Sequence, residues 1–282
     1  MATAIITDSA ADISAEQARE FGVEVAPLWI HIDGERLRDG VDITRASFYA
    51  RMAAAKDLPS SEPLDAAGFT AIFSKHVDKG DECVVPIVSS KLSKTYENAL
   101  AAASRFAGKV HVVDSQTLSG GLLLLAYVAG EMAKKGAGAK DIVAALERGK
   151  STQNGYQIMP TLEFLGRSGR LNKAIVALGT VLKVNPILQA RDGIIETAGQ
   201  TRTFDKAKEL IVDIATRHVT DVAATRFAVG HTHAPALADE MAKALHEKLS
   251  LPPKTFIVHE VGPSVAVNVG PGAIAIFSVT GI

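Results

Sequence analysis

The chain of 282 residues has a single cysteine, no excess of either charge and no long hydrophobic run. Because Cys83 stands alone, a disulfide within the chain and a metal site built on thiolates are excluded, and we expect a small buried apolar side chain there. Lys and Arg number 30, Asp and Glu 31, so a general surface for nucleic acid or anionic membrane is not expected. The longest apolar run, residues 122–130, is too short to span a bilayer.

Several familiar signals are also missing. The first residues lack the basic start and longer apolar core of a signal peptide, so we expect a cytoplasmic protein without an integral membrane segment. There is no Gly-x-x-x-x-Gly-Lys phosphate loop, no Gly-x-Gly-x-x-Gly fingerprint and no Gly-x-Ser-x-Gly elbow. His231 and His233 have no acidic or thiol partner nearby in the sequence, so no metal or other cofactor is expected.

What is present is an alternation of strand and helix patterns that predicts an α/β protein of two domains. Residues 1–153 predict a mainly parallel sheet, with strands at 4–7, 23–32, 82–88 and 109–113 and helices at 45–55, 66–77, 93–107, 119–135 and 139–150. Ser14, with Gln17 three residues later, predicts a capping box before a further helix that ends near Phe21. The helix at 119–135 is apolar almost all round at its start and is therefore expected to be buried.

Residues 154–282 predict a second α/β domain with a mixed sheet. Strands are expected at 156–159, 184–189, 194–197, 227–230, 255–260 and 273–279, and helices at 205–218 and 235–249. Residues 163–171 read as a basic, glycine-punctuated turn, and 262–272 as a β-like run between two Gly-Pro units. Arg191-Asp192-Gly193 predicts a hairpin between two strands.

The segment from Cys83 to Tyr96 is the most informative, because an apolar strand runs through a serine-rich turn into a helix. Backbone N–H groups at a helix start have no internal partner, and hydroxyls add further donors, so this geometry suits a small anion. Two more hydroxyl-bearing turns, at residues 7–9 and 114–115, follow strands that would end at the same edge of the sheet. Each could instead merely cap a helix, but three together favour a shared site. The proline-bounded loop 58–63 holds two further hydroxyls and reads equally well as an ordinary turn.

In this order, the motifs resemble those of the DegV family, which includes the FakB fatty-acid-binding proteins of bacteria. Ser60-Ser61-Glu62-Pro63 is similar to the family's Thr-Ser-Gln-Pro, and residues 89–96 to its Ser-Ser-Gly-Leu-Ser-Gly-Thr-Tyr. The other similar stretches are residues 5–12, 113–115, 165–171, 185–188 with 192–193, 230–231 and 269–272. The resemblance covers essentially the whole chain and implies two α/β domains with a long-chain fatty acid between them.

The resemblance also implies roles for individual residues. Ser60, Ser61, Ser90 and Ser93 would hold the fatty-acid carboxylate, together with Asn268. The protein would not itself be an enzyme but would present the acid to a separate fatty acid kinase, with Arg170 and Arg202 contacting that partner.

Four positions depart from the family pattern. Asn268 stands where the family commonly has histidine, and an asparagine cannot carry a proton, which puts support of phosphoryl transfer in question. Lys91 and Lys94 replace glycines, and Glu62 replaces glutamine. Two alternatives therefore stay open: a hydrolase or kinase-like enzyme acting on a small metabolite, and a lipid carrier or sensor without a kinase partner.

Overall fold

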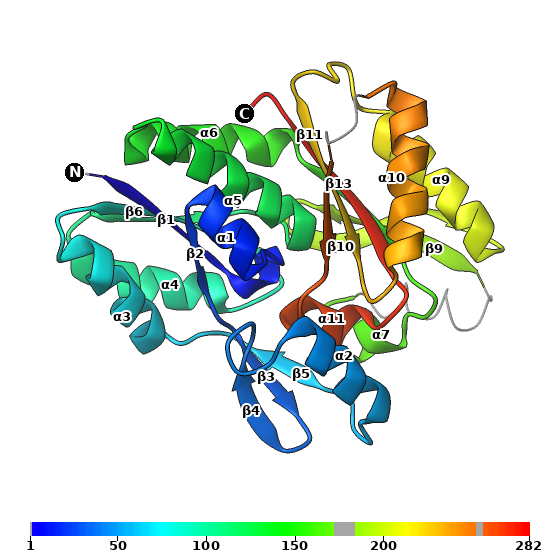
Figure 1. The fold of residues 1–282 in the computed structure, drawn as a ribbon, viewed down its shortest axis with the longest axis horizontal. Helices are drawn as coiled ribbons and strands as arrows, with labels where there is room; N and C mark the ends of the chain where they lie inside the picture. Colours follow the sequence, from blue (N-terminus) through cyan, green and yellow to red (C-terminus); the bar gives the residue numbers. More distant parts are fainter. Residues whose placement is uncertain (1, 172–183, 252–255) are drawn as a thin grey trace.

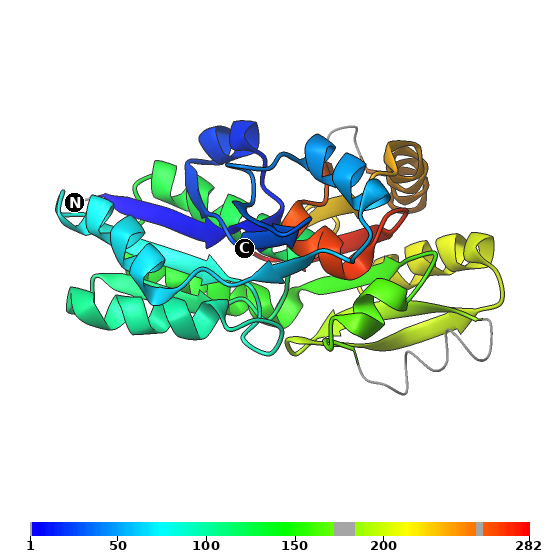
Figure 2. The same cartoon turned by 90° about the horizontal axis from the view of Figure 1, so that it is seen from below.

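A computed structural model describes residues 2–171, 184–251 and 256–282, which form three β-sheets with surrounding helices (Figure 1). Seen from below, the molecule is elongated, with the first strands of the chain at one end and the helices α9 (Phe204–Thr216) and α10 (Pro235–Leu249) at the other (Figure 2). Within these ranges, no helix combines the length and the apolar character needed to cross a membrane.

The first sheet is parallel throughout, as predicted. Its strands lie in the order β2-β1-β6-β7. Their bounds are β1 (Thr3–Asp8), β2 (Val23–Ala26), β6 (Glu82–Ile87) and β7 (Val110–Asp114). Helices α3 (Ala66–Val77) and α4 (Thr95–Ala103) pack against each other and against β6 and β7. Helix α1 (Ala15–Phe21) begins with the predicted capping box of Ser14 and Gln17, and the short 3-10 helices η1 (Ser9–Ala11) and η2 (Ser104–Phe106) complete this half.

The second sheet is mixed, as predicted, with strand order β10-β9-β8-β13-β11-β12. Its strands are β8 (Asn154–Ile158), β9 (Asn185–Arg191), β10 (Ile194–Thr201), β11 (Thr225–His231), β12 (Phe256–Glu260) and β13 (Ile274–Thr280). Within this sheet, β11 and β12 form the one parallel pair among the described strands. The predicted hairpin joins β9 to β10, and Asp192 and Gly193 both have the positive φ that a tight turn of this kind requires. Of the strand predicted at 255–260, the first residue lies outside the described ranges.

Helix α5 (Ser119–Lys134) lies between these two sheets. It contacts β1 and β6 on one side and β11 and β13 on the other, and it also packs on α1 and α6 (Ala139–Thr152). Contact on both sides explains why its first turns are buried all round. Gly120 is required here, because a Cβ atom at that position would stand 2.4 Å from the ring of Phe277 on β13. The opposite face of the second sheet is covered by α9 and α10 (Figure 1).

A third, antiparallel sheet of order β4-β3-β5 corrects two predictions. Its strands are β3 (Trp29–Ile32), β4 (Glu35–Arg38) and β5 (Ser60–Glu62), and helix α2 (Arg45–Ala54) follows β4. The single strand predicted at 23–32 is wrong, because β2 and β3 belong to different sheets and Pro27 lies between them. Proline has no N–H to donate to a ladder, which favours a break there. The loop expected at 58–63 contains β5, which pairs with β3.

Residues 262–272 are not β-like, because they contain the helix α11 (Pro263–Val269). Pro263 occupies the first turn, where its missing N–H costs no hydrogen bond. Valines favour strands on average, but Val265, Val267 and Val269 are buried against other elements, and that packing outweighs propensity. The turn expected at 163–171 likewise contains a short helix, α7 (Glu163–Arg167), which packs on α11.

The domain boundary near residue 153 stays a prediction. Strands before it form the first and third sheets, and strands after it form the second sheet. Helix α11, however, packs on β3, β5 and α2, which precede the boundary. The two halves therefore share a wall, and the largest buried apolar cluster contains residues of both.

Candidate functional site

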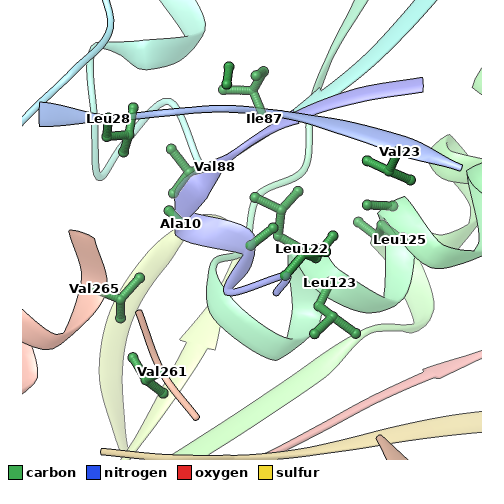
Figure 3. Close-up of a cluster of buried hydrophobic side chains, with 14 of the residues drawn as sticks. Ala10, Val23, Leu28, Ile87, Val88, Leu122, Leu123, Leu125, Val261 and Val265 are labelled. Carbon is green, nitrogen blue, oxygen red and sulfur yellow. The ribbon is translucent and has the colours of Figure 1, made fainter. Parts of the chain in front are cut away.

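A cavity lies where the serine turn (residues 88–94), β5, α7 and α11 meet, and we call it the Ser93 cavity. Figure 3 shows Leu28, Val88 and Ala10 on one side of this region, with Val265 and Val261 facing them. The residues that line the Ser93 cavity are Ala10, Leu28, Ser61, Val88, Leu92, Ser93, Leu118, Gln157, Leu165, Arg170, Ile195, Ser264, Val265, Asn268 and Val269. Most are apolar, and the polar ones come from both halves of the chain.

The backbone of the serine turn is already hydrogen-bonded within the protein. The amide of Val88 donates to Asp8 Oδ2 at 2.8 Å, and that of Ser90 to Asp114 Oδ1 at 3.1 Å. The amides of Leu92 and Ser93 both donate to the carbonyl of Ser89. These amides are therefore occupied, and recognition of an anion falls to side chains instead. This differs from the expected use of free backbone N–H groups.

The turns that follow β1, β6 and β7 do meet at one edge of the first sheet, as predicted. Their polar groups serve mainly to tie the turns together. The Ser90 hydroxyl donates to Asp114 Oδ2 at 2.5 Å, and Asp8 also accepts from the amide of Ala10. Ser90 does not line the Ser93 cavity, whereas Ser93 does. The Ser93 hydroxyl lies 2.8 Å from the hydroxyl of Thr95.

Lys91 and Lys94 do not line the cavity. The ammonium group of Lys91 donates to the carbonyl of Asp192 at 2.8 Å, beside the Ser89 hydroxyl, which donates to the carbonyl of Gly193. Both bonds cross from the serine turn to the β9–β10 hairpin. Lys91 thus joins the two halves, and Lys94 is exposed at the start of α4.

Strand β5 turns Ser61 toward the cavity and leaves Ser60 exposed. Glu62 does not line the cavity, and its carboxylate is bound by Arg36 at 2.8 Å and by His31 at 2.6 Å. Hydrogen bonds from Arg36 and then His31 hold the pKa of Glu62 at about 2. The glutamate that replaces the family's glutamine is therefore occupied by partners away from the cavity.

Arg170 connects the two walls of the cavity. Its Nε donates to the carbonyl of Leu92 at 3.0 Å, and its Nη1 donates to Asn268 Oδ1 at 2.8 Å. Asn268 in turn donates to the carbonyl of Ser264 on α11. Burial lowers the pKa of Arg170, but a guanidinium stays charged and has five N–H donors, so donors remain for a ligand. Arg202, in contrast, is exposed before α9 and does not line the cavity.

A second, smaller cavity adjoins the first, and we call it the Thr232 cavity. The two cavities share Leu118, Gln157, Val265 and Val269 as lining residues. Its remaining lining residues are Ser119, Gly230, Thr232, Val261, Ala273, Ile274, Ala275 and Phe277. The four shared residues therefore stand between the Ser93 cavity and the mainly apolar Thr232 cavity at the second sheet.

Buried carboxylates hold α11 in place behind the cavity. Asp12 Oδ1 accepts from the amide of Gly262 at 2.7 Å, and Asp39 Oδ2 accepts from the amide of Ser264 at 3.0 Å. Burial raises the pKa of Asp12 to about 7 and also raises that of Asp39. His259 lies 3.9 Å from Asp12 Oδ2, and burial lowers its pKa to about 3.

Sequence reasoning missed several of these groups. Gln157 and Ser264 stand in segments whose pattern signals only strand, and the cavity role of Arg170 depends on how the second half folds against the serine turn. Asp12 lies within the stretch that is similar to the family's opening motif, and this similarity was the one feature of the sequence that pointed to it. His231, the histidine considered for a hydrolase, lines neither cavity, and its Nδ1 accepts from the amide of Ala234.

No group of three or more His, Cys, Asp or Glu side chains is placed to hold a metal ion within the described ranges. The donor set around the Ser93 cavity instead consists of hydroxyls, two amides and a guanidinium, which are groups that can bind a carboxylate or another anion.

Comparison with known proteins gives a consistent family. A DegV domain-containing protein of Caldanaerobacter subterraneus subsp. tengcongensis is 31% identical over 277 residues, covering 97% of each chain. A structure reported as fatty acid binding of a DegV family protein from Thermus thermophilus matches with a TM-score of 0.91 and 27% identity, over 99% of this chain and 100% of that one. A stearic acid-binding protein from Eubacterium ventriosum matches with a TM-score of 0.89 and 25% identity, over 98% and 97%. The model of the family described as "Uncharacterised protein, DegV family" matches residues 2–281, and the chain therefore belongs to the DegV family.

Proposed function

We propose that this protein binds a long-chain fatty acid, with the carboxylate in the Ser93 cavity and the acyl chain extending into the Thr232 cavity. The observation that carries the proposal is the lining of the Ser93 cavity. The lining of the Ser93 cavity is mostly apolar but includes hydroxyls and a guanidinium. It shares residues with the Thr232 cavity, whose lining is mainly apolar. An acid head and a hydrocarbon tail fit this division.

The carboxylate would be held by side chains. Ser61 and Ser93 supply hydroxyl donors, and Arg170 supplies charge. Asn268 orients Arg170 by accepting from Nη1, a task that needs no titratable group. Ser60 and Ser90 are weaker candidates, because Ser60 is exposed and the Ser90 hydroxyl donates to Asp114. Charge-assisted hydrogen bonds of this kind are stronger than neutral ones.

The acyl chain would supply most of the binding free energy. About 15 methylenes at ~0.8 kcal/mol each amount to roughly 12 kcal/mol before the cost of association is subtracted. The fatty-acid-binding protein from Thermus thermophilus and the stearic acid-binding protein from Eubacterium ventriosum match this fold over 100% and 97% of their own chains, which supports the same ligand class here.

The role that we propose for the bound acid is presentation to a separate fatty acid kinase, without catalysis by this chain. Family resemblance supports this step, and exposed Arg202 is available for such an encounter. Arg170 is half-buried in the cavity wall, so in the proposal it would contact the ligand first and the partner only at the cavity mouth.

The direct experiment is denaturing extraction of the purified protein followed by lipid mass spectrometry, with uptake of added fatty acid by the stripped protein. We expect a bound acyl chain and stoichiometric uptake. Absence of both would sink the proposal. Turnover of an added cognate kinase on the loaded protein then separates presentation to a kinase from a carrier or sensor role.

A further inference from the structure

Gln157 is a polar side chain on an apolar surface. It lies on β8, where it pairs with Ala275 of β13 and Leu188 of β9. Residues alternate along a strand, so Gln157 shares a face with Gly155 and Met159. Gly155 lies under the ring of Phe277, and Met159, Leu188 and Ala275 belong to the large apolar cluster between the halves.

The side chain of Gln157 is largely buried, and its amide opens onto the two cavities. Only 9% of the residue is exposed, and within residues 2–171, 184–251 and 256–282 no hydrogen bond to its side chain is formed. Gln189 on the next strand provides a contrast, because it is half-buried and its Nε2 donates to the hydroxyl of Tyr156. Leaving a buried amide without a partner is unfavourable, so such groups are uncommon in native proteins.

Gln157 lies where the two cavities share a wall. It lines both, beside Leu118, Val265 and Val269. Beyond it the Thr232 cavity offers the hydroxyl of Thr232, whereas that of Ser119 already lies 3.4 Å from His259 Nε2. Thr232 Oγ1 accepts from the amide of Ala273 at 2.7 Å, so its own O–H can donate to a ligand. An entirely hydrocarbon tail would satisfy none of these groups.

We propose that the preferred ligand is a long-chain fatty acid that carries a hydroxyl group within its chain, hydrogen-bonded to the amide of Gln157. The inference rests on the proposed function, since it takes the acyl chain to run past Gln157. A hydroxyl both donates and accepts, as does the glutamine amide, whereas a methylene does neither. A site with a buried polar group discriminates strongly in favour of a ligand that pairs it.

The test compares stearic acid with its monohydroxylated positional isomers. Calorimetric titration of the stripped full-length protein gives the affinity for each acid. We expect an internal hydroxyl at one region of the chain to increase affinity roughly 3- to 10-fold over stearic acid, the range for one net hydrogen bond. Hydroxyls at other positions should weaken binding, because they would be buried without a partner.

A matched pair of variants assigns the effect to Gln157. In Gln157→Leu, the isomer that binds the parent protein most tightly should lose its advantage over stearic acid. Stearic acid itself should bind this variant at least as tightly as it binds the parent protein. Gln189→Leu makes the same chemical change on the other face of the sheet and should leave the profile unchanged. The parent profile needs no variant, so the test stands even if Gln157→Leu fails to fold.

The outcomes separate this inference from the proposed function. If stearic acid binds but no hydroxylated isomer binds more tightly, the preference for a hydroxyl is wrong and fatty-acid binding stands. If the profile has a maximum that Gln157→Leu does not shift, Gln157 is not the partner. If neither stearic acid nor any isomer binds, the proposed function itself has failed.

Discussion

The serine turn and helix α11 form opposite walls of the Ser93 cavity, but different chemistry holds each wall in place. The serine turn is fixed by backbone amides that donate to Asp8, Asp114 and the Ser89 carbonyl. Helix α11 is fixed by Asp12 and Asp39, whose pKa values are raised by burial. Burial raises the pKa of Asp8 in the first wall to about 6 and that of Asp12 behind the second wall to about 7, so attachment of the second wall is the more sensitive to pH near neutrality.

The largest expected effect is a dependence of stability on pH that comes from Asp12. Burial raises its pKa to about 7 from an unfolded value near 4. Between these values the folded state keeps a proton that the unfolded state has released, so stability falls as pH rises through this window and is constant above it. Asp8, raised to about 6, acts in the same direction, and His259, lowered to about 3, acts in the opposite one below pH 6.5.

The measurement is urea unfolding of the parent and of Asp12→Asn from pH 4 to pH 8. The amide does not titrate, so the difference between the two proteins isolates Asp12. That difference should change by roughly 1.4 kcal/mol per pH unit within the window, the slope for one proton. Parallel curves would show that Asp12 does not retain its proton.

Removing the Asp12 side chain tests the attachment of α11 itself. Asp12→Ala leaves the buried amide of Gly262 without an acceptor, which should reduce stability by about 3 kcal/mol at pH 5. Asp12→Asn keeps an acceptor oxygen and tolerates the positive φ of this position, so it serves as the control with a much smaller loss. Equal losses in the two variants would contradict the role of the Gly262 hydrogen bond.

The opposite wall is tested through ligand affinity. Ser93→Ala removes a hydroxyl from the cavity and should weaken fatty-acid binding about 10-fold, the effect of one hydrogen bond to a charged group. Ser90→Ala is the matched control, because its hydroxyl donates to Asp114 and lies outside the cavity lining. Unchanged affinity in Ser93→Ala would remove Ser93 from the site.

The smallest expected effect concerns Lys91. Its ammonium donates to the carbonyl of Asp192 at an exposed position, so Lys91→Ala should change stability by less than about 0.5 kcal/mol. Fatty-acid affinity should change less than about twofold, because Lys91 lies outside the cavity. A larger loss of affinity would indicate that the Lys91 ammonium lies near the carboxylate of the bound fatty acid.

Local signals were sufficient for much of the fold. Helices α3 and α10 have the predicted bounds, and the parallel sheet followed from the apolar run of β6, because such runs occur where both faces of a strand are covered. Helix α11 could not be predicted in the same way. Its valines favour a strand locally, and only its packing on β5 and α7 makes the helix the better state.

The same limit applies to the site. Ser61, Ser93 and Asn268 were predicted because they lie in motifs, and all three line one cavity, although their role in binding stays a prediction. The place of Arg170 in that cavity depends on the fold of the second half against Leu92, and Gln157 gives no signal in an alternating strand. Neither contact is encoded within a short window of sequence.

The hydrogen bond between Asp12 and Gly262 spans 250 residues of sequence, and this separation has a consequence for biosynthesis. Ribosomes add residues in chain order, so the serine turn and β5 leave the ribosome long before α11. During that interval the Ser93 side of the cavity exists without its opposing wall. The cavity can therefore be completed only after α11, the last of its walls in chain order, has been synthesised.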